Sequence, residues 1–180
     1  MKFILVRHGE TDYNKEKKIQ GLINNLLNDS GRRQAKNLRM NFVNEKIDVC
    51  YVSPLVRCVE TAMILIGDRV EMISDNRLVE RNMGDFEGVD ASLYESAPYW
   101  DYSLNLSLKN VEPIQSIFDR CQDFLDYIMN KYDNDSTILI VTHGAPFRAI
   151  HHILKKTNLN SSLLFDVKNC SFEEIVVNKN

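Results

Sequence analysis

The chain has 180 residues and a formal net charge of −3, which is enough for one domain with a buried core. Its 44% hydrophobic and 26% charged residues give the composition of an ordinary soluble globular protein. Basic and acidic residues are interspersed, which excludes the extended cationic surface that nucleic acid or an anionic membrane would need. Any site for an anion must therefore be local.

Cysteine spacing and hydropathy exclude further classes. No Cys-x-x-Cys pair is present, which argues against a zinc site or a dithiol redox centre and predicts reduced packing residues. The cysteines are Cys50, Cys58, Cys121 and Cys170. The first apolar run is too short for a signal peptide, and no segment approaches the roughly 20 apolar residues of a membrane span. We expect a cytoplasmic protein.

Strands and helices alternate in the first half of the chain. The residue patterns predict a buried strand over 2–6, irregular structure over 19–30, a helix over 31–44, a strand over 48–52, a helix over 55–66 and a strand over 70–73. Ser53-Pro54 ends the second of these strands, because proline lacks the donor that a strand ladder needs.

The second half opens with an excursion at about 82–112, where the pattern weakens and short helical pieces are expected. Glu112-Pro113 then opens a long amphipathic helix that should run to about Tyr132. A strand over 137–141, a helix reaching about 156 and a closing strand or hairpin within 163–177 follow. This alternation predicts a single α/β domain over 1–180, built as a three-layer α/β/α sandwich with a mostly parallel central sheet. The order of the strands is not readable.

Polar residues leave three of these strands at their carboxyl ends, where α/β sheets bind ligands. They are Arg7-His8 after the first strand, Ser53 to Arg57 after the second, and His143-Gly144 after the last central strand. The planar fork of arginine binds phosphate or carboxylate oxygens in pairs. Two arginines beside two histidines therefore predict a small oxyanion pocket, for which phosphate fits best.

A histidine in such a pocket can act as nucleophile and divide one displacement at phosphorus into two, while nearby cations stabilise the developing charge. No metal is then required. Glu80 is a candidate donor of the proton that the leaving oxygen needs, and it could later activate water. Glu87 competes with Glu80 for this role.

Further motifs occur in a specific order along nearly the whole chain. They are Arg7-His8-Gly9-Glu10-Thr11 with Asn14, Gln20-Gly21, Gly31 with Gln34-Ala35, Ser53-Pro54-Leu55 with Arg57 and Glu60-Thr61-Ala62, Glu80 with Gly84 and Glu87-Gly88, and Thr142-His143-Gly144. In these motifs the chain resembles the histidine phosphatase superfamily, the phosphoglycerate mutase-like group.

The resemblance implies a phosphoglycerate mutase-like fold and a phosphorylated His8. It implies that Arg7, Arg57 and His143 hold the phosphoryl group and that Glu80 is the acid and base. The expected substrate contacts are Asn14, Gln20, Gly21 and the backbone of Gly144. It also implies no metal and no cofactor, with a small phosphorylated metabolite as partner.

A phosphatase is favoured over the alternatives. Mutases of the family carry a longer insertion with basic residues between the acid and the second histidine, whereas this excursion holds no Lys or Arg from Asn82 to Leu108. It holds Asp85, Glu87, Asp90, Glu95 and Asp101 instead, so we expect repulsion of a substrate carboxylate. A mutase, or a catalytically idle module that binds a phospho-ligand, remains the alternative.

The same excursion carries a cluster of aromatic residues. We hypothesise that it covers the pocket and stacks one of them on a ring-bearing leaving group. The candidates are Tyr94, Tyr99, Trp100 and Tyr102. A role in the core or in a homodimer contact is equally compatible with the sequence. For His151 and His152 we expect structural or solvent-facing positions, since adjacent helical residues point to different faces.

Overall fold

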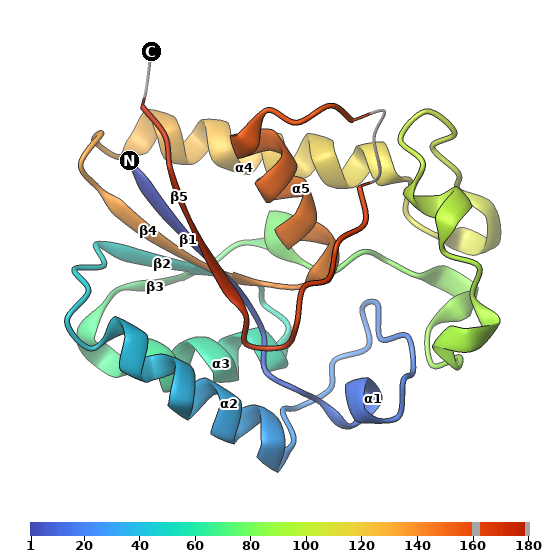
Figure 1. The fold of residues 1–180 in the computed structure, drawn as a ribbon, viewed down its shortest axis with the longest axis horizontal. Coiled ribbons are helices and arrows are strands. Elements are labelled where there is room, and N and C mark those ends of the chain that lie inside the picture. Colours follow the sequence, from blue (N-terminus) through green and yellow to red (C-terminus); the bar gives the residue numbers. More distant parts are fainter. Residues whose placement is uncertain (160–162, 179–180) are drawn as a thin grey trace.

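The structure is a computed structural model in which residues 1–159 and 163–178 are described. Five strands form one sheet in the order β3-β2-β4-β1-β5 (Figure 1). Their bounds are β1 Lys2–Arg7, β2 Val49–Val52, β3 Met72–Ser74, β4 Thr137–Thr142 and β5 Phe172–Val176. The first four run parallel, and β5 pairs antiparallel with β1 at one edge. The predicted α/β class with a mostly parallel sheet is confirmed.

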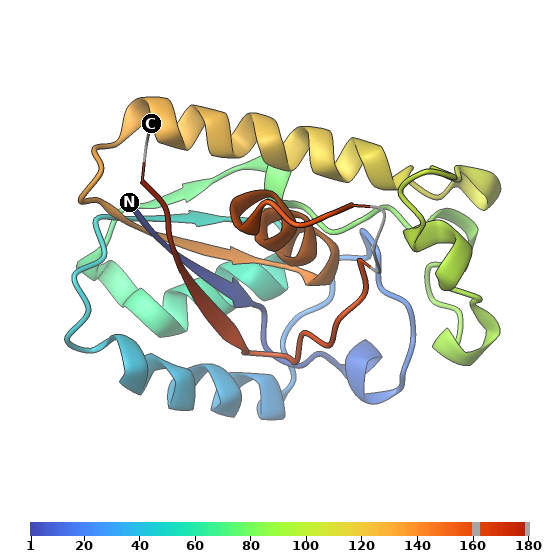
Figure 2. The same ribbon diagram turned by 45° about the horizontal axis from the view of Figure 1, so that its top comes forward.

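Helices cover both faces of this sheet. They are α1 Asp12–Lys15, α2 Asp29–Arg39, α3 Val56–Ile66, α4 Ile114–Lys131 and α5 Gly144–Lys155. Figures 1 and 2 show α2 and α3 on one face and α4 and α5 on the other, so the three-layer arrangement is also confirmed. None of the helices in the described part of the chain is long and apolar enough to cross a membrane.

Alternate side chains of the central strands build two separate cores. In β1, Phe3 and Leu5 belong to the cluster beneath α4 and α5, whereas Ile4 and Val6 belong to the cluster above α2 and α3. All four are fully buried, and each large apolar side chain of this kind contributes about 1.5 to 3 kcal/mol. Burial on both faces explains why these strands read as continuous apolar runs.

Two helix boundaries differ from the prediction. Helix α2 begins at Asp29, because the Asn28 side chain accepts a hydrogen bond from the Gly31 amide, and a short 3-10 turn replaces its expected last turn. Helix α1 was not predicted. Thr11 and Asn14 form a capping box at its start, in which asparagine takes the place of the usual glutamate or glutamine.

The excursion contains short 3-10 turns between extended residues. These turns are Gly84–Phe86, Ala91–Leu93, Ala97–Trp100 and Leu108–Asn110. Figure 2 shows this green to yellow segment beyond the carboxyl ends of the strands. It therefore lies at the end of the sheet at which the predicted site residues emerge.

The loop after β1 crosses the start of α2 at a very close distance. A Cβ built on Gly31 would lie 2.1 Å from the Glu10 carbonyl oxygen. The Asn28 amide donates to the same oxygen at 3.0 Å. Glycine at position 31 thus lets α2 hold the loop that carries His8.

Gly31→Ala is expected to lower the free energy of unfolding by about 1 to 3 kcal/mol, because the new methyl group has to displace backbone atoms. Urea unfolding measures the effect. Lys36→Ala, at an exposed position of the same helix, is the matched control. Equal stability of the two variants would contradict the close approach.

Candidate active site

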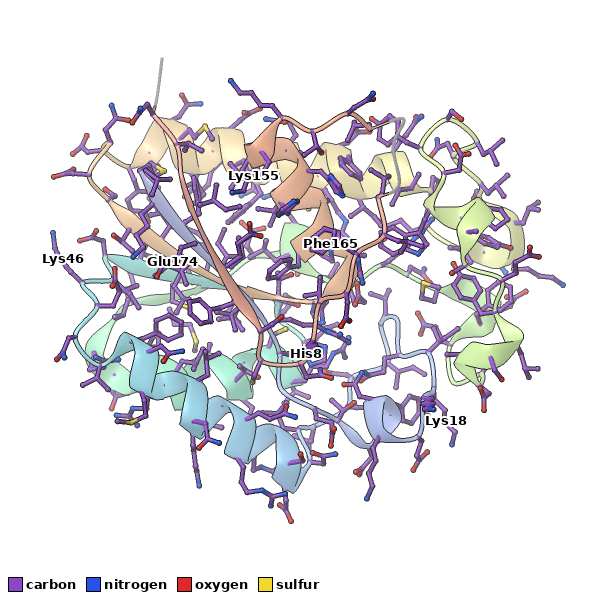
Figure 3. All side chains as sticks on the ribbon, in the orientation of Figure 1. His8, Lys18, Lys46, Lys155, Phe165 and Glu174 are labelled. Atoms are coloured by element: carbon purple, nitrogen blue, oxygen red, sulfur yellow. The ribbon has the colours of Figure 1, made fainter. Side chains whose placement is uncertain are left out.

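His8 follows β1 directly and is 1% exposed, at the point where that strand leaves the sheet (Figure 3). Its Nδ1 lies 2.7 Å from the carbonyl oxygen of Gly9. A carbonyl can only accept, so Nδ1 carries the proton of the neutral ring. The unshared electron pair is therefore on Nε2, which makes this nitrogen the nucleophilic atom of the ring.

His143 lies beside His8 with its ring held on both sides. The two ring centroids are 5.1 Å apart. Arg57 Nε donates to His143 Nδ1 at 3.2 Å, and Ser53 Oγ lies 2.7 Å from His143 Nε2. Because arginine is a donor only, Nδ1 accepts and Nε2 donates to the serine hydroxyl. The ends of β2, β4 and α3 thus fix one orientation of this imidazole.

Arg57 also ties the loop after α1 to the site. Its Nη1 donates to the carbonyl of Ile23 at 2.7 Å and its Nη2 to the carbonyl of Gly21 at 2.9 Å. The side chain is fully buried, and burial lowers its pKa from the ordinary value. Arg57 therefore positions the loop that forms one wall of the site, and its guanidinium also contributes positive charge there.

Glu80 caps helix α5 from outside that helix. Its carboxylate accepts hydrogen bonds from the backbone amides of Gly144 and Ala145, each at 3.0 Å, and from the amide of Arg81 at 3.0 Å. The first two amides belong to the unpaired N-terminal turn of α5, which favours negative charge. The carboxylate is thus held in a fixed position beside the site.

A cavity of about 250 Å³ opens in front of His8. Its walls include seven of the nine predicted site residues, namely Arg7, His8, Asn14, Gln20, Gly21, Glu80 and Gly144. Arg57 and His143 are not among the lining residues and lie behind the wall, in contact with one another. The structure therefore brings all nine residues together from segments far apart in the sequence.

Arg7 retains an unused donor in this wall. Its Nη1 donates to the carbonyl of Val167, whereas its buried Nε has no hydrogen-bond partner among the described residues. An unsatisfied buried guanidinium nitrogen is costly. A ligand oxygen in the cavity would offset that cost.

The prediction that acidic residues of the excursion face the pocket and repel a substrate carboxylate is wrong. None of the five acidic residues of the excursion lines the cavity. Basic side chains line it instead, namely Arg81, which directly precedes the segment, and Lys18 and Arg148 from other parts of the chain. The acidic side chains project elsewhere: Glu87 accepts from the Leu22 amide and Asp101 from the Ser103 amide. The sign of charge along a loop does not give the sign inside the pocket that it covers.

The aromatic cluster divides into two parts. Tyr94 and Trp100 line the cavity. Tyr99 is buried beneath Tyr94, with ring centroids 5.3 Å apart, and Tyr102 packs on Phe118 of α4 at 5.2 Å. Two of the four candidates are therefore positioned to meet a leaving group.

Sequence reasoning missed three residues of the cavity wall and the role of Ser53. Arg81, Arg148 and Lys18 line the cavity, and Ser53 orients His143. Arg148 lies one helical turn after Gly144 and donates to its carbonyl at 3.0 Å. The helical period after Thr142-His143-Gly144 was the signal that could have identified it.

Two other reactive side chains, Cys58 and His151, are engaged in packing or in an ion pair. Cys58 is buried against His143, and burial raises the pKa of its thiol. His151 pairs with Glu173 at 2.7 Å on the outer side of α5. Within residues 1–159 and 163–178, no group of three or more His, Cys, Asp or Glu side chains is placed to hold a metal ion.

The pKa values of His8 and His143 lie well below the ordinary value of 6.5. Burial is the main cause for both, followed by Arg7 and then Arg57 for His8, and by Arg57 for His143. Both rings are therefore neutral at neutral pH. For His8 this keeps the electron pair on Nε2 available.

We expect the protein to lose stability as the pH falls below about 6.5. In that range the two histidines take up protons in the unfolded chain and not in the folded one, so the unfolded state binds more protons. Urea unfolding at pH 7.5 and pH 5.5 should differ by about 2 to 3 kcal/mol for two such groups. His8→Ala should remove about half of this difference. Equal or greater stability at pH 5.5 would contradict the burial of neutral rings.

Comparison with known proteins identifies the family. The model of the histidine phosphatase superfamily (branch 1) matches residues 3–180. Phosphoserine phosphatase 1 of Hydrogenobacter thermophilus is 30% identical over 182 residues, which cover 97% of this chain and 86% of the relative. Phosphoglycerate mutase-like protein 4 of Arabidopsis thaliana is 35% identical over 158 residues, which cover 82% and 68%.

A solved structure agrees with these relatives. The phosphoserine phosphatase of Entamoeba histolytica in complex with 3-phosphoglyceric acid matches with a TM-score of 0.78 and 26% identity, over 96% of this chain and 89% of that one. The chain belongs to the histidine phosphatase superfamily and is a phosphoric monoester hydrolase.

Proposed function

We propose that this hydrolase acts on small phosphorylated metabolites through a phosphohistidine at His8, without a metal. Nε2 of His8 attacks phosphorus, and the P–O bond to the leaving alkoxide breaks as the N–P bond forms. Glu80 delivers a proton to the leaving oxygen. Water then attacks the phosphohistidine, with Glu80 taking its proton, and phosphate leaves.

The observation that carries this proposal is the state of His8. Its Nδ1 is committed to the Gly9 carbonyl at 2.7 Å, and Arg7 and Arg57 contribute to its lowered pKa. The ring is therefore neutral, oriented and flanked by cations. Arg7, Arg57 and Asn14 would hold the phosphoryl oxygens. His143 would join them by turning its Nε2 proton from Ser53 Oγ to a phosphoryl oxygen.

Gln20, Gly21 and Gly144 border the space for the rest of the ester. The cavity volume of about 250 Å³ lies below the about 300 to 1,000 Å³ of drug-sized ligand sites, which suits a small metabolite. Relatives named as phosphoserine phosphatases support substrates of this size. A cytoplasmic location and a homodimer stay predictions.

Hydrolysis of an aryl phosphate in the presence of a strong chelator tests the proposal. We expect full activity with the chelator and none in His8→Ala. Loss of activity on chelation, restored by added metal, would overturn the metal-independent mechanism. Absence of activity in the natural protein would favour the idle binding module.

Product analysis separates hydrolysis from mutase chemistry. With 3-phosphoglycerate as substrate, phosphorus NMR should show free phosphate as the product. Accumulation of 2-phosphoglycerate without free phosphate would favour the mutase. Free phosphate and 2-phosphoglycerate have distinct resonances, so a single spectrum distinguishes hydrolysis from mutase chemistry.

A further inference from the structure

Asn169 lies in the turn that leads into β5, and its side-chain nitrogen meets three oxygens beside the site. Nδ2 is 3.1 Å from the carbonyl oxygen of His8, 3.4 Å from that of Gly9 and 3.2 Å from Oδ1 of Asn14. Asn169 is not among the residues that line the cavity in front of His8. Its influence on a bound ester therefore has to pass through these partners.

The partners decide which end of each amide is the nitrogen. Backbone carbonyls only accept hydrogen bonds, so the Asn169 atom that faces His8 and Gly9 is the nitrogen. This nitrogen has two hydrogens, one for the carbonyls of His8 and Gly9 and one for Asn14. The Asn14 atom that meets it is therefore the oxygen, which also accepts from the backbone amide of Thr11 at 3.2 Å.

This arrangement leaves Nδ2 of Asn14 as the end of the amide that can donate to a substrate. Asn14 lines the cavity, and its Oδ1 is engaged by Thr11 and Asn169. A flipped amide would set Nδ2 against these donors and would present an acceptor to phosphoryl oxygens, which are acceptors themselves. The orientation of this one amide thus decides whether Asn14 attracts or repels the phosphoryl group.

A tight turn at the end of β1 holds Asn169 in place. Cys170 has a left-handed φ of 53°, and its amide donates to the carbonyls of Arg7 and His8, each at 3.1 Å. The amide of Arg7 donates in turn to the carbonyl of Ser171 at 3.1 Å. Figure 1 shows this segment passing the end of β1 before it enters β5. The edge strand β5 therefore brings Asn169 to the strand end from which His8 emerges.

We propose that Asn169 is a positioning residue, which fixes the amide of Asn14 and the backbone of His8 relative to one another through a single nitrogen. The nucleophile and the amide that holds the phosphoryl group then keep one spacing during attack on phosphorus. A displacement of about 1 Å in such a site can cost about 10²-fold in rate. The inference rests on the proposed function and adds to it a residue that touches neither the substrate nor the reacting atoms.

Asn169→Ala and Asn169→Leu test this role through kcat/KM for an aryl phosphate. Both variants remove the donor, whereas only leucine keeps a side chain of similar size. We expect each to lower kcat/KM by about 10 to 100-fold. Lys168→Ala, at the exposed neighbouring position, should leave it unchanged. Activity of Asn169→Leu close to that of the natural protein would show that Asn169 serves packing alone and would overturn the proposal.

A double-mutant cycle shows whether Asn169 acts through Asn14. Asn14→Asp keeps an oxygen for Thr11 and Asn169 and removes the donor to the phosphoryl group, so no amide remains to be oriented. The loss of kcat/KM caused by Asn169→Leu should be at least about fivefold smaller in Asn14→Asp than in the natural protein. Equal losses in the two backgrounds would overturn the coupling.

Binding of inorganic phosphate separates the role of Asn169 from the proposed function. In titration calorimetry, phosphate should bind Asn169→Leu at least about fivefold more weakly than the natural protein, whether or not an ester is hydrolysed. Unchanged affinity would overturn the role of Asn169. An inactive protein whose phosphate affinity falls in this way would support that role and contradict the proposed hydrolysis.

Discussion

His8→Ala is expected to lower the turnover of phosphate esters by about 10⁴-fold or more, because loss of a covalent nucleophile removes the whole two-step path. The fold is expected to persist. Among residues 1–159 and 163–178, the one hydrogen-bond partner of this ring is the carbonyl of its own neighbour, Gly9, and burial of the ring opposes its charged form. Phosphate release and the thermal midpoint measure the two effects.

His151→Ala is the matched control for this variant. It removes an imidazole that pairs with Glu173 on the outer side of α5 and should leave turnover close to that of the natural protein. Turnover of His8→Ala within about tenfold of the natural protein would rule out the phosphohistidine, since other routes supply far less catalysis. A large fall in its midpoint would show that His8 is structural.

Glu80→Gln is expected to lower turnover by about 10² to 10⁴-fold for alkyl phosphates, the usual contribution of a general acid and base. In kcat/KM, which depends on formation of the phosphohistidine and not on its later hydrolysis, the loss should be much smaller for a nitrophenyl phosphate, whose leaving group departs without a proton. Comparison of the two esters therefore separates proton donation from positioning. An equal loss for both would contradict the role of the acid.

Glu87→Gln provides the control and decides between the two glutamates. One oxygen of Glu87 accepts from the amides of Leu22 and Met83, at 2.8 and 3.1 Å, and the amide oxygen of glutamine can do the same. Glu80 uses both oxygens, on the amides of Gly144 and Ala145. Its replacement should therefore also lower stability, by about 1 kcal/mol.

The central strands could be predicted because burial on both faces leaves a clear pattern. In β1 and β4 nearly every residue is buried, so each strand is a continuous apolar run that a polar residue ends. The order of strands could not be predicted. It depends on pairings such as Phe3 with Ile138, and neighbouring apolar strands carry no local mark of their partner.

The residues that carry reactive groups were predictable because they follow strand ends and match motifs in order. Their partners were not. Ser53 on His143, and the amides of α5 on Glu80, are contacts between distant segments. The side chains of the excursion that face the cavity were harder still to predict, because this segment has no helical or strand periodicity that would indicate which residues point inward. Tyr94 and Tyr99 are equally aromatic, yet Tyr94 lines the cavity and Tyr99 supports it from beneath.

The charge of the pocket could not be predicted from local sequence either. The acidic excursion predicted a pocket that repels carboxylates, whereas Arg81 and Arg148 line its inner side. They precede and follow the excursion in sequence and meet at Trp100. Local composition therefore gave the wrong sign for the pocket, and the assignment as a phosphatase rests on the family relatives rather than on that charge.

Trapping of the phosphoenzyme tests the central claim most directly. The protein is mixed rapidly with a phosphate ester labelled in its phosphoryl group, quenched in alkali and digested. We predict one labelled peptide that contains His8, with a phosphoryl group that is stable to alkali and released by acid. His8→Ala should give no labelled peptide. A label on another residue, or hydrolysis without any labelled intermediate at every quench time, would contradict a phosphohistidine at His8.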